Sequence, residues 1–176
     1  MTQIIGSIDN AWKRGKITNI HHLIFTSDSI LAFDILNKKE IGAEIRNYLM
    51  SDPLTLTPIS AVQDYGIMRD SKGIHEEIIS EAINAGIHIE KNIDREIKKQ
   101  PPEFVKIDYD KIESINLRQG EYLRLPSLTI FVAGDKIEYK LVHNNYEKLA
   151  HLDKDTFNKY SELITKVFAD KAVIKN

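Results

Sequence analysis

The chain has 176 residues, 42% of them hydrophobic, and its 24 basic residues nearly balance 26 acidic ones. This length suits one domain with a buried core, and the near-zero net charge disfavours a dedicated nucleic-acid binder, whose affinity comes largely from phosphate neutralisation. The absence of cysteine excludes disulfides, thiol catalysis, iron–sulfur clusters and cysteine-based zinc sites.

The start of the chain has neither the basic region nor the apolar run of a signal peptide. No apolar stretch approaches the roughly 20 residues that a membrane-spanning helix needs. We therefore expect a soluble, cytoplasmic protein without a transmembrane segment. Isoleucine-rich apolar stripes with Lys and Glu on the intervening faces are typical of thermophile proteins.

Residues 17–36 carry the pattern of a β-hairpin, in which two apolar runs flank a polar turn at Thr26–Ser29. Ser and Asp favour such turns because their side chains bond to nearby backbone amides. Upstream, Trp12 is expected in a short lead-in that ends in an exposed basic turn.

Residues 37–103 change to helical periodicity. A first helix carries Ile41, Ile45, Tyr48 and Leu49 on one face and stops before Pro53, and a second starts near Thr57 and Pro58. The third and longest is predicted over about 74–99, where two prolines end it.

Small residues lie midway along this third helix, at Ala82, Ala85 and Gly86. They allow another backbone to approach closely, either in the core of the same chain or at a subunit interface. Most apolar helix faces are core, so core packing is the ordinary interpretation and an interface is the alternative.

Period-2 alternation returns over residues 104–142, which predicts an antiparallel meander. Pro126 lies early in its middle strand, which favours an edge position or a bulge there. A helix over about 155–169 follows, capped by Asp155 or Thr156. Its apolar face is expected to pack against the sheet and close the core. That face consists of Phe157, Tyr160, Ile164, Val167 and Phe168.

Four segments together resemble the pleckstrin-homology-like (PH-like) domains of bacteria and archaea: 22–33 (HLIFTSDSILAF), 104–118 (FVKIDYDKIESINLR), 128–132 (LTIFV) and 134–141 (GDKIEYKL). In that family a phrase of the form I-P-Y-x-D-I-x-x-V opens the closing meander, and an earlier strand reads L-T-D-x-R-L-I-V. Thr26 matches the latter, whereas Ser29 stands where the family has Arg.

The resemblance implies one α+β domain over residues 1–176. Its core would be a partly open antiparallel β-barrel, capped by the C-terminal helix and carrying residues 37–103 as a helical insertion. In such folds function resides in loops and exposed edges, and the fold alone does not assign it.

Basic residues precede the predicted hairpin at Lys13, Arg14 and Lys16. The inositol-lipid-binding version of the PH-like domain also has an Arg-x-Arg in its first hairpin, which this chain lacks. These three residues therefore stay candidates either for a solvated turn or for weak binding to an anionic membrane.

The histidines do not predict a metal site, and no cofactor is indicated. His21 and His22 are adjacent on a strand and point to opposite faces, so a regular strand cannot bring both to one ion. His75-Glu76-Glu77 begins like a zinc-protease helix, but Ile79 stands where the second His is required.

One catalytic pattern stays open. Arg69 and His75 have the spacing of the Arg/His signature of HEPN-type ribonucleases, which cleave RNA without a metal. A motif counts only in its structural context, which in that family is a helix of a helical-bundle dimer.

The sequence thus favours a non-enzymatic interaction module that engages a protein partner or itself. The surfaces expected to do so are a sheet edge near Pro126 or the small-residue face of the 74–99 helix. A metal-independent ribonuclease and an anionic-membrane binder are the alternatives.

Overall fold

The computed structural model describes residues 2–13, 19–36, 72–99, 101, 104–120, 125–141 and 152–175. These residues form one sheet, whose strands are β1 (Ile4–Lys13), β2 (Asn19–Thr26), β3 (Ser29–Leu36), β4 (Val105–Asp108), β5 (Ile112–Arg118), β6 (Ser127–Val132), β7 (Asp135–Leu141) and β8 (Ala172–Lys175). The helices are α3 (Lys72–Lys91), α4 (Ile93–Lys99) and α5 (Lys154–Phe168), with short 3-10 turns at Tyr109–Lys111 and Ala169–Lys171.

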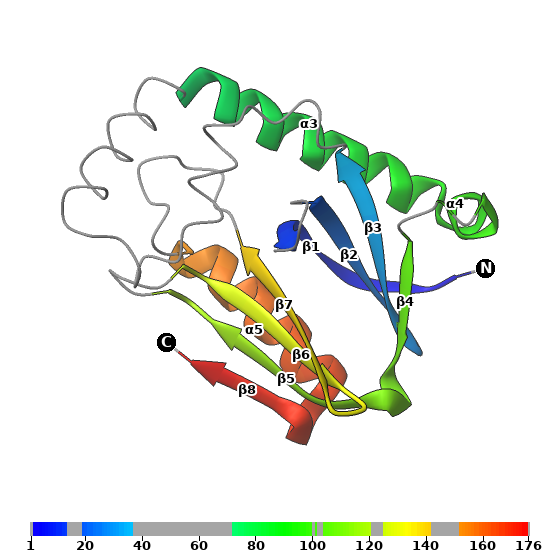
Figure 1. Cartoon of the computed structure of the whole chain (residues 1–176), viewed down its shortest axis with the longest axis vertical. Helices are drawn as coiled ribbons and strands as arrows, with labels where there is room; N and C mark the ends of the chain where they lie inside the picture. The colour runs from blue at the N-terminus through cyan, green and yellow to red at the C-terminus, as the bar shows by residue number, and fades with distance from the viewer. Residues whose placement is uncertain are drawn as a thin grey trace.

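The strands follow the order β4-β3-β2-β1-β7-β6-β5-β8 (Figure 1). All pairings are antiparallel except that of β5 with β8. The sheet is open, and β4 and β8 form its edges. The expected α+β class, with a mostly antiparallel sheet and a C-terminal helix, is confirmed.

The first half of the sheet contains the predicted hairpin as β2 and β3, joined by Ser27 and Asp28. The expectation of a short lead-in around Trp12 was wrong, because Ile4–Lys13 is a full strand and Trp12 is buried. This strand escaped detection because register shifts on both sides of Gly6–Ile8 break its alternation.

The predicted meander is present as β5, β6 and β7. The edge position or bulge expected at Pro126 was wrong, since β6 pairs with strands on both sides and neither ladder has a register shift beside Pro126. Pro126 directly precedes β6, where its missing N–H interrupts no ladder. Its carbonyl still accepts a 2.9 Å hydrogen bond from the amide of Leu141.

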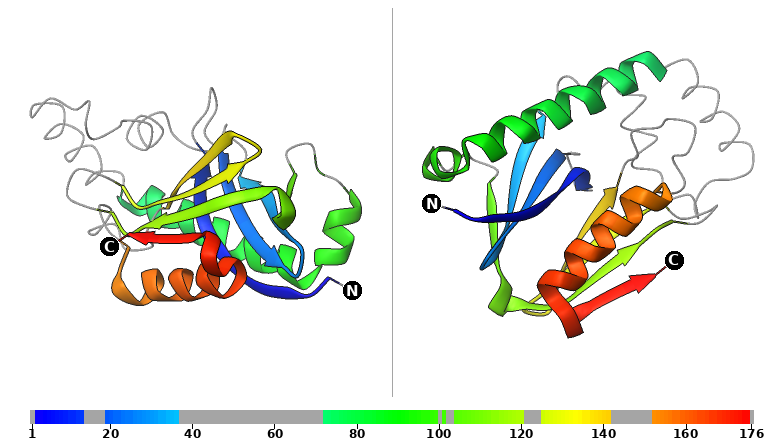
Figure 2. Two further views of the ribbon diagram at one scale, coloured as in Figure 1. Left: turned by 90° about the horizontal axis from the view of Figure 1, so that it is seen from below. Right: turned by 180° about the vertical axis from the view of Figure 1, so that it is seen from behind.

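The main core lies between the inner face of the sheet and α5 (Figure 2). The predicted apolar face of α5 is confirmed for Phe157, Tyr160, Ile164 and Phe168, which are buried. The helix cap is Asp153, not the expected Asp155 or Thr156. Its carboxylate accepts a 2.9 Å hydrogen bond from the Thr156 amide, which satisfies one of the free amides at the helix start.

A second apolar cluster lies on the opposite face of the first half of the sheet, under α3 and α4. Alternation along β2 separates the two cores, because Leu23 and Phe25 join the main core whereas Ile24 joins this one. The other members of the cluster are Leu31, Phe33, Ile89, Ile93, Ile97 and Phe104, with Ile4 and Ile35.

The predicted long helix over 74–99 is present as two helices that meet at Asn92. The expected stop before the double proline is confirmed, because α4 ends at Lys99. The helices predicted near residues 41–49 and from Thr57 lie outside the described residues.

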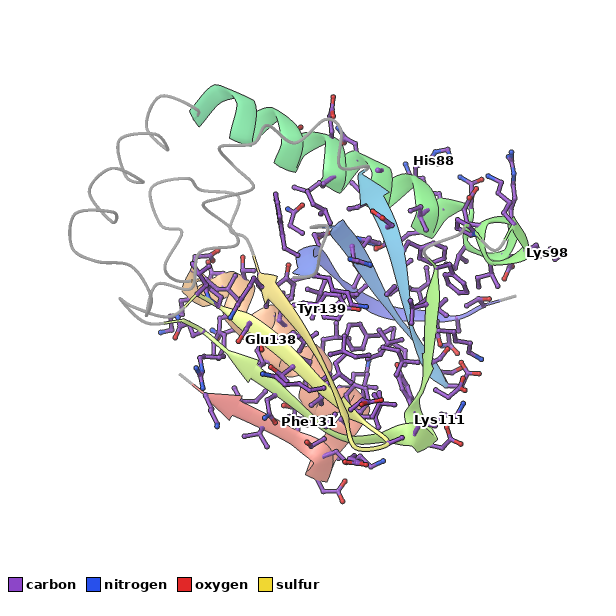
Figure 3. All side chains as sticks on the ribbon, viewed as in Figure 1. His88, Lys98, Lys111, Phe131, Glu138 and Tyr139 are labelled. Atoms are coloured by element: carbon purple, nitrogen blue, oxygen red, sulfur yellow. The ribbon has the colours of Figure 1, made fainter. Side chains whose placement is uncertain are left out.

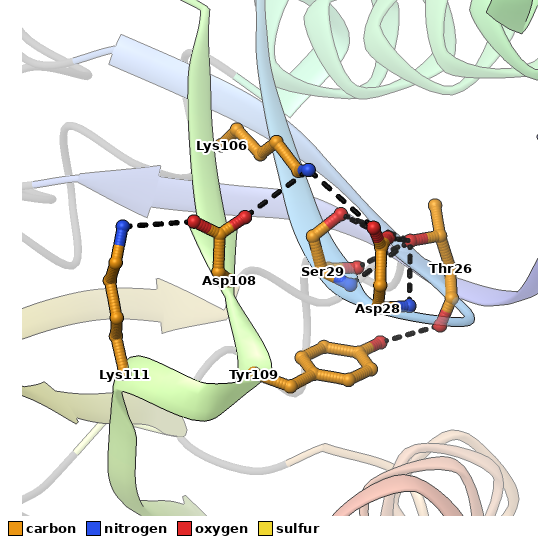
Figure 4. A network of polar contacts seen from close by, with 7 residues as sticks. All are labelled: Thr26, Asp28, Ser29, Lys106, Asp108, Tyr109 and Lys111. Carbon is orange, nitrogen blue, oxygen red and sulfur yellow. Dashed lines mark hydrogen bonds and ion pairs between the residues drawn. The ribbon is translucent and has the colours of Figure 1, made fainter.

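A polar network ties the β2–β3 turn to β4 (Figure 4). The hydroxyl of Thr26 accepts from the amide of Ser29 at 3.1 Å and lies 2.9 Å from the Asp28 carboxylate. Tyr109 forms two hydrogen bonds with the turn. Its hydroxyl donates to the Thr26 carbonyl at 2.8 Å, and its amide donates to the Asp28 carbonyl at 2.9 Å. Lys106 contacts the carboxylates of Asp28 at 3.5 Å and of its neighbour Asp108 at 3.2 Å.

Thr26→Val tests this network, since valine keeps the shape of threonine but offers no acceptor to the turn amides. Thr26 is buried, and a buried amide that loses its partner costs about 1–3 kcal/mol. We expect the free energy of unfolding in urea to fall by that amount. Ser27→Ala, at the exposed neighbouring position, is the control and should change it by less than about 0.5 kcal/mol. Equal effects of the two substitutions would refute the role of Thr26.

The same network predicts sensitivity to acid. A hydrogen bond from Ser29 lowers the pKa of Asp28, and one from Lys111 lowers the pKa of Asp108. Because both pKa values are lower in the folded state, these carboxylates stabilise the fold above the ordinary value of about 3.9. Their contribution is lost as the pH falls below that value through the folded pKa. Below about pH 4, we expect the free energy of unfolding to decline less steeply in Asp28→Asn/Asp108→Asn than in the unaltered chain; parallel curves would contradict this.

Candidate functional site

The residues proposed for RNA cleavage are not brought together in the described part of the chain. Arg69 lies outside it, and so does the side chain of His75, although the backbone of His75 belongs to α3. The helix α3 begins at Lys72, two residues before the predicted start near residue 74. The Arg/His pair therefore stays a prediction.

Of the three basic candidates, Lys13 ends β1 and is partly buried. Arg14 and Lys16 lie outside the described residues. The structure describes no helix that is both long and apolar enough to span a bilayer.

The small-residue patch packs within the chain. Ala82 has no exposed surface and Gly86 is buried, whereas Ala85 is half-buried. Since α3 contacts β1, β2 and β3, the patch serves close packing of α3 on the sheet. Ala82 and Gly86 are thus covered by their own chain, which favours core packing, and the subunit interface stays a prediction.

A β-bulge in β1 lies opposite His22. Ile8 pairs with Leu23 and Ala11 with His21, so two residues of β1, Asp9 and Asn10, face the single residue His22 of β2. Asn10 adopts a left-handed conformation with φ 52°, as Asn does more readily than most residues. Such bulges redirect side chains locally.

His22 is 1% exposed and lies between two carboxylates on different elements. Its Nε2 lies 2.8 Å from Glu90 Oε1 on α3, and this nitrogen donates because a carboxylate only accepts. Its Nδ1 lies 2.9 Å from Asp9 Oδ1 without forming a hydrogen bond, so that contact is electrostatic.

Gly86 completes the arrangement. A Cβ placed on Gly86 would lie 2.5 Å from Nδ1 and 2.8 Å from Cε1 of His22, so the imidazole rests directly on the backbone of α3. Gly86 and Glu90 are one helical turn apart and share a face. We call Asp9, His22, Gly86 and Glu90 the His22 clamp.

The His22 clamp does not suit metal binding, because its carboxylates approach opposite ends of one ring. Within the described residues no group of three or more His, Asp or Glu side chains is arranged so that it could hold a metal ion. The ring is also closed to solvent, which removes it from reach of a substrate. What the clamp provides is attachment of α3 to the sheet through a titratable group.

Sequence reasoning placed His21 and His22 on opposite faces, which is confirmed. His21 packs edge-on against Tyr139 in the main core, with ring centroids 5.5 Å apart, and His22 faces α3. The partners of His22 were missed. Two signals pointed to them: polar Asp9 and Asn10 inside an apolar segment, and Gly86 one turn before Glu90.

Two further charged clusters are satisfied locally. On the outer face of β7, Lys136 and Lys140 each lie 2.6 Å from the Glu138 carboxylate (Figure 3). Burial acts to raise the pKa of Glu138, but the hydrogen bonds from both lysines outweigh it and bring the pKa to about 2. These lysines therefore do not add up to an unbalanced basic surface.

A surface hollow beside α4 is lined by Asp94, Arg95, Lys98 and Lys99. Asp94 accepts a 2.8 Å hydrogen bond from the Thr2 amide. Of its three basic residues, Lys99 is paired with Glu96 at 2.6 Å.

Comparison with models of protein families, with curated proteins and with solved structures finds no match.

The edge strand β8 is the other candidate surface. Among the strands that the structure describes, it pairs with β5 alone. Its alternate residues Ala172 and Ile174 pack on the main core, whereas Val173 is 41% exposed and Lys175 is exposed. An edge of this kind can accept a further strand.

Gly86→Ala tests the His22 clamp. Alanine favours a helix over glycine by about 1 kcal/mol, so an open site would be stabilised. Here the added methyl meets the imidazole, and we expect a loss of about 1–3 kcal/mol in the free energy of unfolding. In a His22→Ala background, which removes the ring, the same substitution should become neutral or stabilising. Asn84→Ala, at an exposed position of α3, is the control, and stabilisation by Gly86→Ala alone would show that the contact is absent.

Proposed function

We propose that this chain is a PH-like interaction module without catalytic activity, which binds an extended segment of a protein partner along β8. The strand order and the helix α5 behind the sheet are consistent with a partly open PH-like barrel. The observation that carries the proposal is the open side of β8, which presents Val173 at its centre.

Addition of a strand uses two kinds of contact. Main-chain hydrogen bonds to the edge supply affinity, and side chains at alternate positions supply specificity. The inner side of β8 is already filled, because Ala172 and Ile174 belong to the core. Specificity must therefore come from the outer side, which carries Val173 and Lys175.

These two residues define the chemistry of the partner. Across two paired strands, an apolar side chain is favoured beside a β-branched one, and a charged side chain is favoured beside one of the opposite sign. The bound segment should therefore place an apolar residue beside Val173 and, two residues along, an Asp or Glu beside Lys175. The neighbouring Lys171 is already engaged, since its ammonium donates to the Ile112 carbonyl at 2.7 Å.

Selection of displayed seven-residue peptides on the full-length chain tests this proposal. We expect the selected peptides to alternate apolar and acidic positions and to shift the backbone NMR signals of β8. Val173→Lys should weaken their binding by at least about tenfold, the loss expected of a central contact worth about 1.4 kcal/mol or more. Ile87→Lys is the matched control, because Ile87 on α3 is 42% exposed; it should leave binding unchanged.

Equal binding of the peptides to both lysine variants would overturn the proposal. So would a dimer in sedimentation at micromolar concentration that Val173→Lys dissociates, because a second copy of the chain would then occupy β8.

A further inference from the structure

We propose that the His22 clamp is a protonation-dependent latch, which holds α3 on the sheet more tightly when the imidazole carries two protons. The inference does not rest on the function proposed for β8. It rests on the contacts of one buried ring with two carboxylates and a helix backbone.

Two of the three contacts belong to α3. Glu90 accepts the Nε2 proton at 2.8 Å, and Gly86 lets the helix backbone touch the ring. The third contact, Asp9 at 2.9 Å from Nδ1, belongs to β1. The imidazole therefore links helix and sheet, and a change in its charge acts on that link.

Whether Nδ1 carries a proton decides whether its contact with Asp9 is attractive or repulsive. While Nε2 donates to Glu90, a neutral ring presents the lone pair of Nδ1 to a carboxylate oxygen, and two acceptors repel each other. A proton on Nδ1 turns this contact into an attraction between opposite charges. It also strengthens the hydrogen bond to Glu90, which the carboxylate already makes charge-assisted, because the donor then carries a positive charge as well.

Among the described residues, no positively charged side chain contacts the His22 ring. On β3 the register partner of His22 is the apolar Phe33. On α5, burial raises the pKa of Tyr160, with the charge of Asp9 as a further cause, so this phenol stays neutral. On α3, His88 and Lys91 are exposed, and His88 projects away from the sheet (Figure 3).

The latch controls an apolar surface. Beneath α3 and α4 lie Ile24, Leu31 and Phe33, which are at most 2% exposed while the helices are docked. A weaker clamp raises the population in which this surface opens, since local opening depends on the contacts that hold an element down. The predicted consequence is a protonation-dependent exposure of the outer face of β2 and β3.

Hydrogen exchange of the full-length chain tests the latch, with amide protection factors corrected for intrinsic pH dependence. The protection factors are measured across the pH range in which the NMR signals of the His22 ring titrate. We expect protection of α3 amides to fall about fivefold as His22 loses its proton, the size expected when an ion pair with Glu90 reverts to a hydrogen bond from a neutral ring. Amides of α5 serve as the internal reference and should stay constant.

Asp9→Asn is the decisive variant, because its amide can donate to a neutral Nδ1 while keeping the shape of the side chain. We expect the pH dependence of α3 protection to disappear in Asp9→Asn and to persist in the control His88→Gln. The proposal is overturned if protection of α3 does not follow the titration of His22, if α5 changes in parallel, or if Asp9→Asn leaves the pH dependence intact.

Discussion

The pairing of β1 with both β2 and β7 joins the two halves of the sheet. On one side lie β2, β3 and β4, on the other β7, β6, β5 and β8. The ladder between β1 and β7 has three register pairs, from Ala11 to Lys13. A strand in this position must pack on both faces, because α3 covers one and α5 the other. Its sequence is therefore constrained at nearly every residue.

The irregularities of β1 follow from that position. Gly6 lies where α5 comes closest, since a Cβ there would stand 2.8 Å from a methyl of Leu163. Three residues later the bulge directs Asp9 toward His22 and α3. A regular strand would turn alternate side chains to each helix. The bulge adds one residue instead, so that a carboxylate meets the imidazole on the face that α3 covers.

These features also explain what could be predicted from the sequence. The meander was evident because Ile137, Tyr139 and Leu141 alternate without interruption and turn inward together. The strand β1 was missed because its bulge breaks such alternation, and β8 because four residues are too short for a periodic signal. The His22 clamp depends on register and helix docking, which bring Glu90 to a residue 68 positions away. Periodicity assigns a residue to a face and does not name its neighbour across the sheet.

The edge strand β8 and the His22 clamp lie far apart in the sheet and depend on different kinds of interaction. The edge β8 is reached from β2 only through β1, β7, β6 and β5, and its specificity rests on one apolar side chain and one lysine that are exposed. The His22 clamp relies on electrostatic contacts of a buried imidazole, whose carboxylate partners Asp9 and Glu90 are partly exposed. Within the sheet, β1 joins the two halves through its three pairs with β7. The main core joins them as well, since Phe25 of β2 packs edge-on against Phe168 of α5 with ring centroids 6.2 Å apart. A change in the docking of α3 therefore has two routes to β8, one through the pairing at Ala11 to Lys13 and one through the packing of β2 on α5.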